Sequence, residues 1–253
     1  TQLERLLFNQ SGLDFLRRFS LIWVGGGNLP DALALEARVK KIPISPCYGS
    51  TETVAMVTVL PPKEFLIGAN DCGYPLKDVK LKVNCDGALS IKTKRLAKYI
   101  WNENCLENII DKNGWWKSSD SAKLIIKGKI TRLKILGRID TAIISGGETI
   151  FPEKLEERIL KEIIKNDIPV KHIIFSKRIS SKWGEELVAL IKLKNNLKDT
   201  SQEKIIIFLK NIVKSWPQHE RPRSWQICNK LKPNKNQKWN RLKWKEWINS
   251  TKI

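Results

Sequence analysis

The chain has 253 residues, enough for one large domain or two smaller ones. Its 46 Lys and Arg against 26 Asp and Glu leave a formal charge of +20, which points to an anionic partner: nucleic acid, an acidic membrane surface or a phosphorylated small molecule. A hydrophobic fraction of 42% excludes a disordered or collagen-like chain, and the apolar runs are far shorter than the roughly 18 residues of a membrane span.

Hydrophobic periodicity and turn residues predict a mixed α/β pattern in the first part of the chain. In chain order we expect a helix over 1–18 interrupted at Gly12, a strand over 21–24, a helix that begins at Leu29-Pro30 behind an Asn28 cap, strands over 42–48 and 53–59 around a turn at Gly49, a hairpin of strands over 79–83 and 88–92, and a strand over 129–136.

The pattern changes after Asp140, and we place a domain boundary between residues 140 and 141. The expected elements are then a strand over 142–145, a turn at Gly146-Gly147, a helix opened by Pro152, strands over 170–175 and 187–193, a helix capped by Thr200 or Ser201 that runs to Val213, a strand over 225–228 and a helix over 240–249. This β-α-β-β-α-β-α unit of about 110 residues has the size of a domain.

Cysteine and histidine usage gives little to build a metal site or a nucleophile pair. The five cysteines are Cys47, Cys72, Cys85, Cys105 and Cys228. No pair has C-x-x-C spacing, and His172 and His219 are the two histidines of the sequence. We therefore expect free thiols in a reducing, cytoplasmic compartment.

The most basic part of the chain is its last segment, residues 221–253, with ten Lys and Arg against one Glu. Four tryptophans are interleaved with these charges: Trp225, Trp239, Trp244 and Trp247. Basic residues among aromatics are able to hold phosphates and stack on bases, so nucleic-acid binding is one hypothesis. The other is a solvated face in a lysine-rich chain.

Three segments are dense in glycine: residues 24–30 (VGGGNLP), 46–52 (PCYGSTE) and 144–152 (ISGGETIFP). None is a Walker phosphate loop or a G-x-G-x-x-G dinucleotide motif. Singly, each glycine is explained by a tight turn.

Taken together and in order, these and further segments resemble the adenylate-forming superfamily, which contains acyl-CoA synthetases, firefly luciferase and peptide-synthetase adenylation domains. The matching stretches are VGGGNLPDALALEA (24–37), YGSTE (48–52), GYPL (73–76), GWWKSSD (114–120), GRIDTAIISGGETIFPEKLE (137–156), WGEELVALI (183–191), ERPR (220–223) and KPNKNQKWNR (232–241). The resemblance implies α/β and α+β architecture: residues 1–140 would be the C-terminal part of the large AMP-binding domain, and residues 141–253 the small mobile C-terminal lid domain.

The resemblance also implies an activity, that of an AMP-forming acid–thiol ligase. A carboxylic acid would react with ATP, aided by Mg²⁺, to give an acyl-adenylate, and CoA would then displace AMP. The family's Ser/Thr/Gly-rich phosphate loop lies upstream of Y-G-x-T-E, and no such loop stands before Tyr48 here. The resemblance therefore implies a fragment, or a chain that works with a separate upstream polypeptide; a homodimer is a further expectation.

The large-domain motifs carry the implied nucleotide site. Its residues would be Gly26, Gly27, Tyr48, Gly49, Thr51, Asp120 and Arg138. Tyr48 would stack on adenine, Thr51 would hydrogen-bond the α-phosphate and take part in catalysis, and Asp120 would accept from both ribose hydroxyls. Glu52 would help to hold Mg²⁺, a cation that prefers oxygen ligands.

The small-domain motifs imply the hinge, the catalytic lysine and the CoA path. Asp140 would be the hinge, and Lys238 would stabilise the charge that develops during adenylation, with Lys235 as the rival residue. The implied CoA-binding residues are Gly146, Gly147, Trp183, Arg221 and Arg223.

Three stretches are similar to the o-succinylbenzoate–CoA ligases of menaquinone and phylloquinone synthesis: residues 25–37, 48–58 and 144–159. Ala55 and Met56 stand where these ligases often carry a polar pair, so other aryl or fatty acids stay open as substrates. Gln237 and Ser119 stand at usual glycine positions, which keeps an inactive relative as an alternative.

Overall fold

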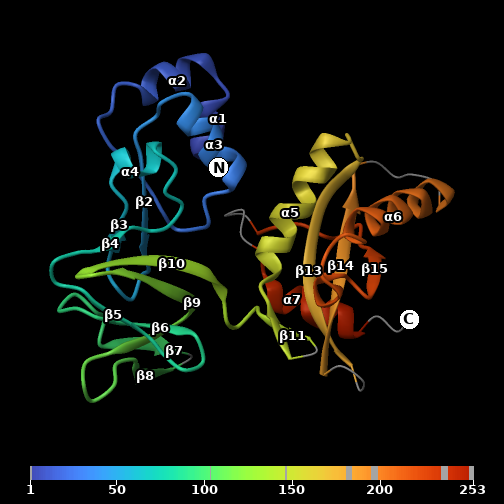
Figure 1. Cartoon of the computed structure of the whole chain (residues 1–253). Coiled ribbons are helices and arrows are strands. Elements are labelled where there is room, and N and C mark those ends of the chain that lie inside the picture. Colours follow the sequence, from blue (N-terminus) through green and yellow to red (C-terminus); the bar gives the residue numbers. More distant parts are fainter. Residues whose placement is uncertain are drawn as a thin grey trace. The chain divides into compact units, whose positions relative to one another are not determined.

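The computed structural model of the chain describes residues 2–102, 104–145, 147–180, 184–194, 199–234 and 239–250. The chain divides into two compact units, Thr1–Leu136 and Gly137–Ile253 (Figure 1). The division falls four residues before the boundary placed at 140/141 from the sequence. Helices and several β-sheets are mixed along the chain, as the predicted fold class requires.

Unit 1 begins with helices and continues with two sheets and a hairpin. Its elements are α1 (Gln2–Leu7), α2 (Gln10–Leu16), β1 (Ile22–Val24), α3 (Asp31–Val39), β2 (Ile44–Gly49), β3 (Met56–Val59), α4 (Pro62–Leu66), β4 (Tyr74–Pro75), β5 (Lys80–Val83), β6 (Ala88–Lys92), β7 (Tyr99–Asn102), β8 (Cys105–Asn108), β9 (Trp116–Lys127) and β10 (Ile130–Arg138).

The helical start of unit 1 differs from the prediction in the position of its interruption. The break falls at Phe8 and Asn9, and Gly12 lies inside α2. The Asn9 side chain caps α2 by accepting the Gly12 N–H at 3.2 Å. A Cβ on Gly12 would lie 2.6 Å from the Leu6 carbonyl oxygen, so this glycine allows the close approach of α1 and α2.

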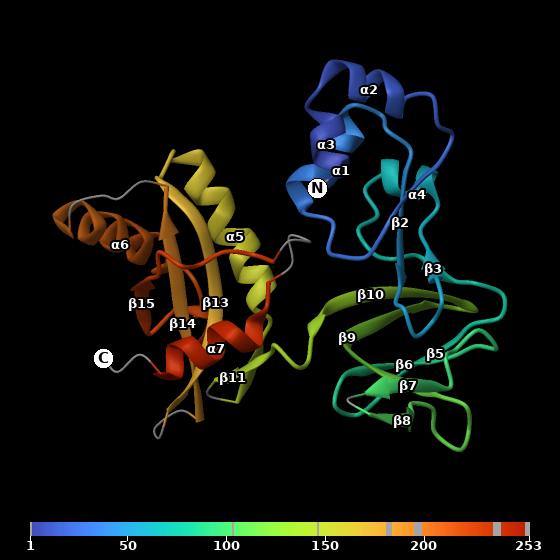
Figure 2. The same cartoon turned by 180° about the vertical axis from the view of Figure 1, so that it is seen from behind.

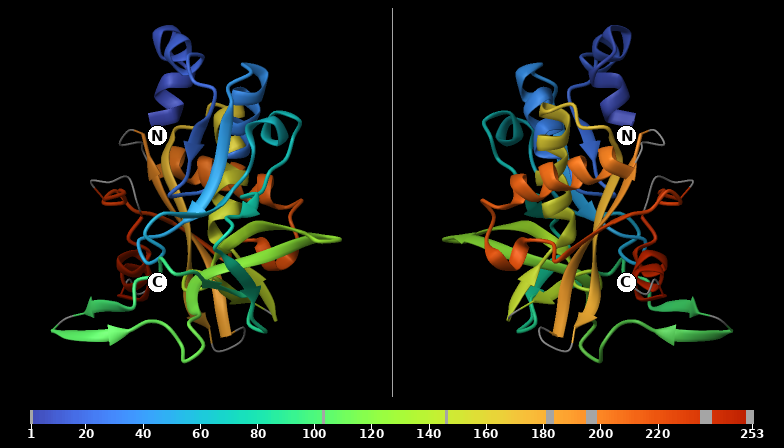
Figure 3. Two further views of the ribbon diagram at one scale, coloured as in Figure 1. Left: turned by 90° about the vertical axis from the view of Figure 1, so that its left-hand side faces the viewer. Right: turned by 90° about the vertical axis from the view of Figure 1, so that its right-hand side faces the viewer.

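Two four-stranded sheets organise the rest of unit 1. The first has the order β1-β2-β3-β4 with β1 and β2 parallel, and the second has the order β10-β9-β6-β5. The helices α1 to α4 pack their apolar residues against Ile42, Ile44 and Leu60, while Leu89, Ile91 and Leu133 belong to a separate cluster. Among the described residues, strands β7 and β8 pair with each other and with no other strand, and they form a separate two-stranded sheet (Figure 3).

Unit 2 holds one sheet and three α-helices among its described residues. Its elements are β11 (Ile143–Ser145), β12 (Glu148–Ile150), α5 (Pro152–Lys165), β13 (Val170–Ser180), β14 (Gly184–Leu193), α6 (Asp199–Val213), the 3₁₀-helix η1 (Gln218–Glu220), β15 (Ser224–Ile227) and α7 (Arg241–Ser250).

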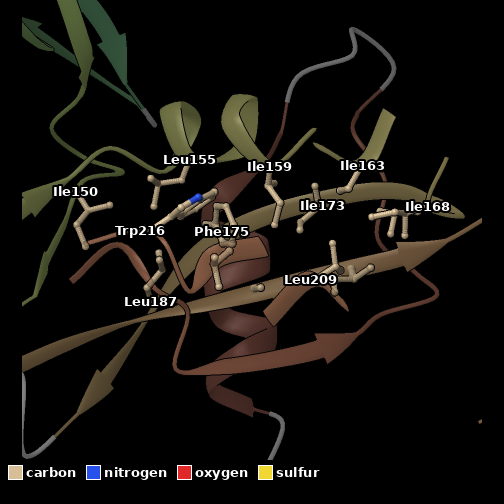
Figure 4. Close-up of a cluster of buried hydrophobic side chains, with 14 of the residues drawn as sticks. Ile150, Leu155, Ile159, Ile163, Ile168, Ile173, Phe175, Leu187, Leu209 and Trp216 are labelled. Atoms are coloured by element: carbon tan, nitrogen blue, oxygen red, sulfur yellow. The ribbon is translucent and has the colours of Figure 1, made fainter. Parts of the chain in front are cut away.

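Strand β14 lies at the centre of the unit 2 sheet: it pairs antiparallel with the long edge strand β13 and with β11, and in parallel with β15. One face packs against α5 and α6: Figure 4 shows Leu155, Ile159 and Ile163 of α5 directed at the strands. The opposite face, with Ile174, packs against Trp244 and its neighbours on α7, which crosses the sheet in Figure 2. The periodicity that predicted α5 is thus the periodicity of its buried face.

Two predicted helix caps are wrong. Pro30, with ψ 138°, holds the cap position of α3, so this helix begins at Asp31 without a side-chain cap, rather than at Leu29 behind Asn28. Helix α6 begins at Asp199, so Thr200 and Ser201 lie inside it.

None of the five cysteines forms a disulfide, as predicted. Among the described residues there is no helix long and apolar enough to cross a membrane.

Candidate functional site

The end of β2 and the middle of β9 bring together two residues of the predicted nucleotide site. The Tyr48 hydroxyl donates a hydrogen bond of 2.6 Å to Oδ2 of Asp120, 72 positions later in the chain. Burial, and then the negative charge and hydrogen bond of Asp120, raise the pKa of Tyr48 well above its ordinary value. The phenol is a donor at neutral pH, and its hydrogen bond holds the Asp120 carboxylate next to the Tyr48 hydroxyl.

The turn after β2 holds Thr51 and Glu52. Gly49 makes the turn fit, because a Cβ there would lie 2.3 Å from the Ala55 carbonyl oxygen. The Thr53 hydroxyl stabilises the turn by accepting the Ser50 N–H at 2.9 Å. Thr51 is exposed and Glu52 is half-buried, so both side chains are able to meet a ligand.

The glycine segment after β1 presents bare backbone. Gly26 has φ +81°, and neither Gly26 nor Gly27 has a described heavy atom within 4 Å of the place of a Cβ. Gly25 differs, since a Cβ there would lie 2.8 Å from the Cys47 sulfur. Gly26 and Gly27 are exposed, so a ligand is able to approach their backbone closely.

Glu52 is the one residue that the sequence offered as a Mg²⁺ ligand. In the described part of the chain no three His, Cys, Asp or Glu side chains gather into a metal site. A lone carboxylate fits Mg²⁺ when substrate phosphates and water supply the other ligands. Glu52 therefore fits a metal that arrives with a nucleotide, and does not by itself form a resident metal centre.

At the start of unit 2 the predicted hinge residue is held by an ion pair. The Arg138 guanidinium binds Asp140, with Nε 2.9 Å from Oδ1. This hydrogen bond lowers the pKa of Asp140 below its ordinary value. The next residue, Thr141, places its hydroxyl 3.0 Å from Oε1 of Glu153, at the first turn of α5.

Arg241, the first residue of α7, was not among the predicted site residues. Its guanidinium contacts Glu153 at 3.0 Å and Glu156 at 2.7 Å, and donates to the Phe175 carbonyl at 3.0 Å. Burial opposes its ionisation, but the hydrogen bond and charge of Glu156, followed by the charges of Glu153 and Asp140, raise the pKa of Arg241. Arg241 closes the KPNKNQKWNR stretch three residues after Lys238, and its place in that motif is the signal that could have singled it out.

The residues predicted for CoA are only partly described. Gly147 is exposed with φ +85°, and Arg223 is exposed. Arg221 donates from Nε to the Trp216 carbonyl at 2.7 Å. Four predicted residues lie outside the described residues: Gly146, Trp183, Lys235 and Lys238.

The tryptophans of the basic C-terminal segment pack into the cores of unit 2. Trp244 is 2% exposed, and Trp239 and Trp247 pack against the same cluster. Trp225 packs against the cluster on the other face of the sheet. The aromatic half of the nucleic-acid hypothesis therefore has a structural explanation, because these rings build the core.

Comparisons with known proteins identify relatives among curated proteins and solved structures. No protein-family model matches the chain. A 2-succinylbenzoate–CoA ligase from Listeria monocytogenes serotype 4b is 31% identical over 193 residues, which is 76% of this chain and 39% of that protein. The solved structure of an Escherichia coli MenE with bound OSB-AMS is 25% identical, with a TM-score of 0.65, and covers 98% of this chain and 49% of the other.

The chain belongs to the adenylate-forming superfamily. Its fold also matches the Bacillus subtilis o-succinylbenzoate CoA synthetase in complex with the acyl-adenylate OSB-AMP, with a TM-score of 0.71 over 93% of this chain and 49% of that one. The chain spans less than half the length of the curated relatives it matches, from 39% to 47% for the first four.

Proposed function

We propose that this chain carries the C-terminal part of the AMP-binding domain and the lid domain of an ATP-dependent acid–CoA ligase. The observation that carries the proposal is the pairing of Tyr48 with Asp120 at 2.6 Å. The resemblance gives adenine to the first residue and the ribose to the second, and a nucleoside needs both within one site. The exposed turn with Thr51 and Glu52 follows directly after Tyr48, where the phosphates would extend.

The proposed reaction has two steps. The substrate carboxylate attacks the α-phosphorus of ATP while the bond to pyrophosphate breaks, and the CoA thiol then displaces AMP from the acyl carbon. In the first step Asp120 accepts from the ribose hydroxyls and Thr51 donates to the α-phosphate. Glu52 would hold Mg²⁺, which offsets phosphate charge when bound, and Lys238 would stabilise the charge that develops.

For the acid we propose o-succinylbenzoate, and hence a place in menaquinone or phylloquinone synthesis. The names of the curated relatives support this choice. The open backbone at Gly26 and Gly27, which would border the acid as well as the nucleotide, leaves room for a flat ring. The five unpaired cysteines support a reducing, cytoplasmic compartment.

We propose that activity needs the remaining half of the adenylation domain, in the same polypeptide or in a separate one. The share of the relatives' length that this chain matches supports this. So does strand β1, which lies at the edge of a sheet beside its parallel partner β2 and whose Trp23 is 60% exposed. Parallel strands are usually covered by further structure. A homodimer is the second arrangement to test.

The test is ATP–pyrophosphate exchange with o-succinylbenzoate, using the chain joined to the upstream part of the Bacillus subtilis relative. We expect exchange with this acid. If only a different acid supports exchange, the proposal of o-succinylbenzoate as substrate is wrong. If none of the acids tested supports exchange, the proposed ligase activity is wrong.

The same assay tests the catalytic lysine. We expect Lys238→Ala to abolish exchange but to spare thioester formation from supplied acyl-adenylate, because the lysine would act only in adenylation. Lys235→Ala is the matched control and should retain both steps. Equal loss of both steps in Lys238→Ala, or loss of exchange in Lys235→Ala instead, would contradict the assignment.

A further inference from the structure

The first residue of α7 is fastened to α5 and β13 by a buried network. Arg241 is 16% exposed and contacts both oxygens of Glu156, at 2.8 and 2.7 Å. Glu156 is buried and also accepts the Phe175 N–H at 2.7 Å. Arg241 completes the triangle by donating to the Phe175 carbonyl at 3.0 Å. A bidentate pair with this many partners holds the guanidinium in one place.

The same guanidinium reaches a second carboxylate that faces the hinge segment. Arg241 Nε lies 3.0 Å from Oε1 of Glu153, and the Thr141 hydroxyl lies 3.0 Å from the same oxygen. Thr141 is also 3.2 Å from the Arg138 carbonyl oxygen. One carboxylate oxygen thus joins the segment 138–141 to the start of α7.

The environment of the other oxygen of Glu153, Oε2, makes the orientation of this carboxylate depend on both of its donors, Thr141 and Arg241. Oε2 is buried and has no hydrogen-bond partner among the described residues. The carboxylate is therefore oriented through Oε1 alone, by Thr141 from one side and Arg241 from the other. If either donor leaves, the carboxylate is free to rotate toward a partner for Oε2, and the other contact weakens.

We propose that Arg241 is a positioning residue that couples the segment 138–141 to the first turn of α7 through Glu153. The meaning of this coupling rests on the proposed function, in which Asp140 is the hinge and Lys238 the adenylation lysine. Lys238 precedes Arg241 by three residues in the sequence. A change at residues 138–141 would then be transmitted through Glu153 to the first residue of α7.

The test is hydrogen–deuterium exchange of the whole chain, with Arg241→Lys as the first variant. Lysine keeps the charge but loses the fork that binds two carboxylates at once. The Ala142 N–H, bonded to the Ile139 carbonyl at 3.2 Å, reports on the hinge segment. We expect its exchange to rise about tenfold, which corresponds to about 1.4 kcal/mol.

Arg178→Lys is the matched control. Arg178 pairs with Glu186 between β13 and β14, and its side chain is 26% exposed. Among the described residues, neither Arg178 nor Glu186 makes a hydrogen bond or ion pair with residues 138–141, so exchange at Ala142 should stay unchanged. An equal rise in both variants, or a rise in Arg241→Lys confined to α7 and β13, would overturn the proposal.

Thr141→Val tests the coupling in the opposite direction, from the hinge segment to α7. It also keeps the proposal testable if Arg241→Lys fails to fold. It removes one hydroxyl, and because coupling between two sites is reciprocal, exchange in the first turn of α7 should rise by a similar factor. Unchanged exchange there would overturn the coupling. Since exchange needs no substrate, the outcome is independent of whether the ATP–pyrophosphate assay succeeds.

Discussion

The hydrogen bond between Tyr48 and Asp120 can be removed with one atom, by Tyr48→Phe. The ring stays packed against the cluster of Leu89, Ile91 and Trp116, so the change deletes the hydroxyl alone. A hydrogen bond to an ionised carboxylate contributes roughly 1.5–3 kcal/mol. At 2.6 Å and in a half-buried position we expect a loss near the lower end, about 2 kcal/mol of unit 1 stability, or about thirtyfold in the unfolding equilibrium.

Hydrogen exchange of the amides of β2 and β9 measures this loss, because both strands belong to unit 1. Tyr74→Phe is the control: its hydroxyl donates to Glu64 at 2.8 Å, also within unit 1. Titration with AMP then separates packing from function, since only Tyr48→Phe should weaken AMP binding, by about tenfold, through a less well oriented Asp120. A stability change below about 0.3 kcal/mol would refute the strength assigned to the bond. Equal AMP affinities of the two variants would refute its role in the site.

Two further outcomes follow from burial and backbone geometry. Burial raises the pKa of the Cys72 thiol to about 11, so at pH 8 only about one molecule in a thousand carries the thiolate. Iodoacetamide should therefore label the exposed Cys85 and Cys105 before Cys72. Equal labelling rates of the three cysteines in peptide mass spectrometry would contradict this. Gly73 has φ +73°, and a Cβ there would lie 2.0 Å from a backbone oxygen of β3, so Gly73→Ala should cost roughly 3 kcal/mol or more in urea unfolding. Gly68→Ala, with φ +108° and open space, should cost about 1 kcal/mol, and similar losses would count against the steric argument.

Local signals in the sequence were enough to predict two kinds of element: those that pair with a neighbour in sequence, and helices with one apolar and one polar face. Leu155, Ile159 and Ile163 follow one face of α5, and that face is buried. The hairpin of β5 and β6 followed from its turn residues. Strand β9, the longest of unit 1, was missed because its sequence is polar and rich in serine. Ser118 and Ser121 are nevertheless buried in it, since neighbours β6 and β10 supply the sheet from distant parts of the chain.

The candidate site shows the same division between local and distant information. The motifs named Tyr48 and Asp120 separately, but their hydrogen bond spans 72 positions and has no local signature. Arg241 was overlooked because, in a segment with ten basic residues, one more arginine reads as solvated charge. Its burial follows from two glutamates on α5, almost ninety positions earlier, which a reading of nearby residues does not connect to it.

The basic C-terminal segment, residues 221–253, contains residues that pack in the core of unit 2 and residues that expose positive charge, and its composition alone does not distinguish them. Trp244 is buried, and Trp225, Trp239 and Trp247 are partly buried against the cores on the two faces of the unit 2 sheet, so these rings contribute to packing. One of its arginines, Arg241, is paired with Glu153 and Glu156 inside unit 2, so its charge is compensated locally. Lys230 and Lys232 of the same segment are exposed to solvent. A positive surface whose tryptophans pack against the core attracts phosphate groups, as the ATP and CoA of the proposed function would require.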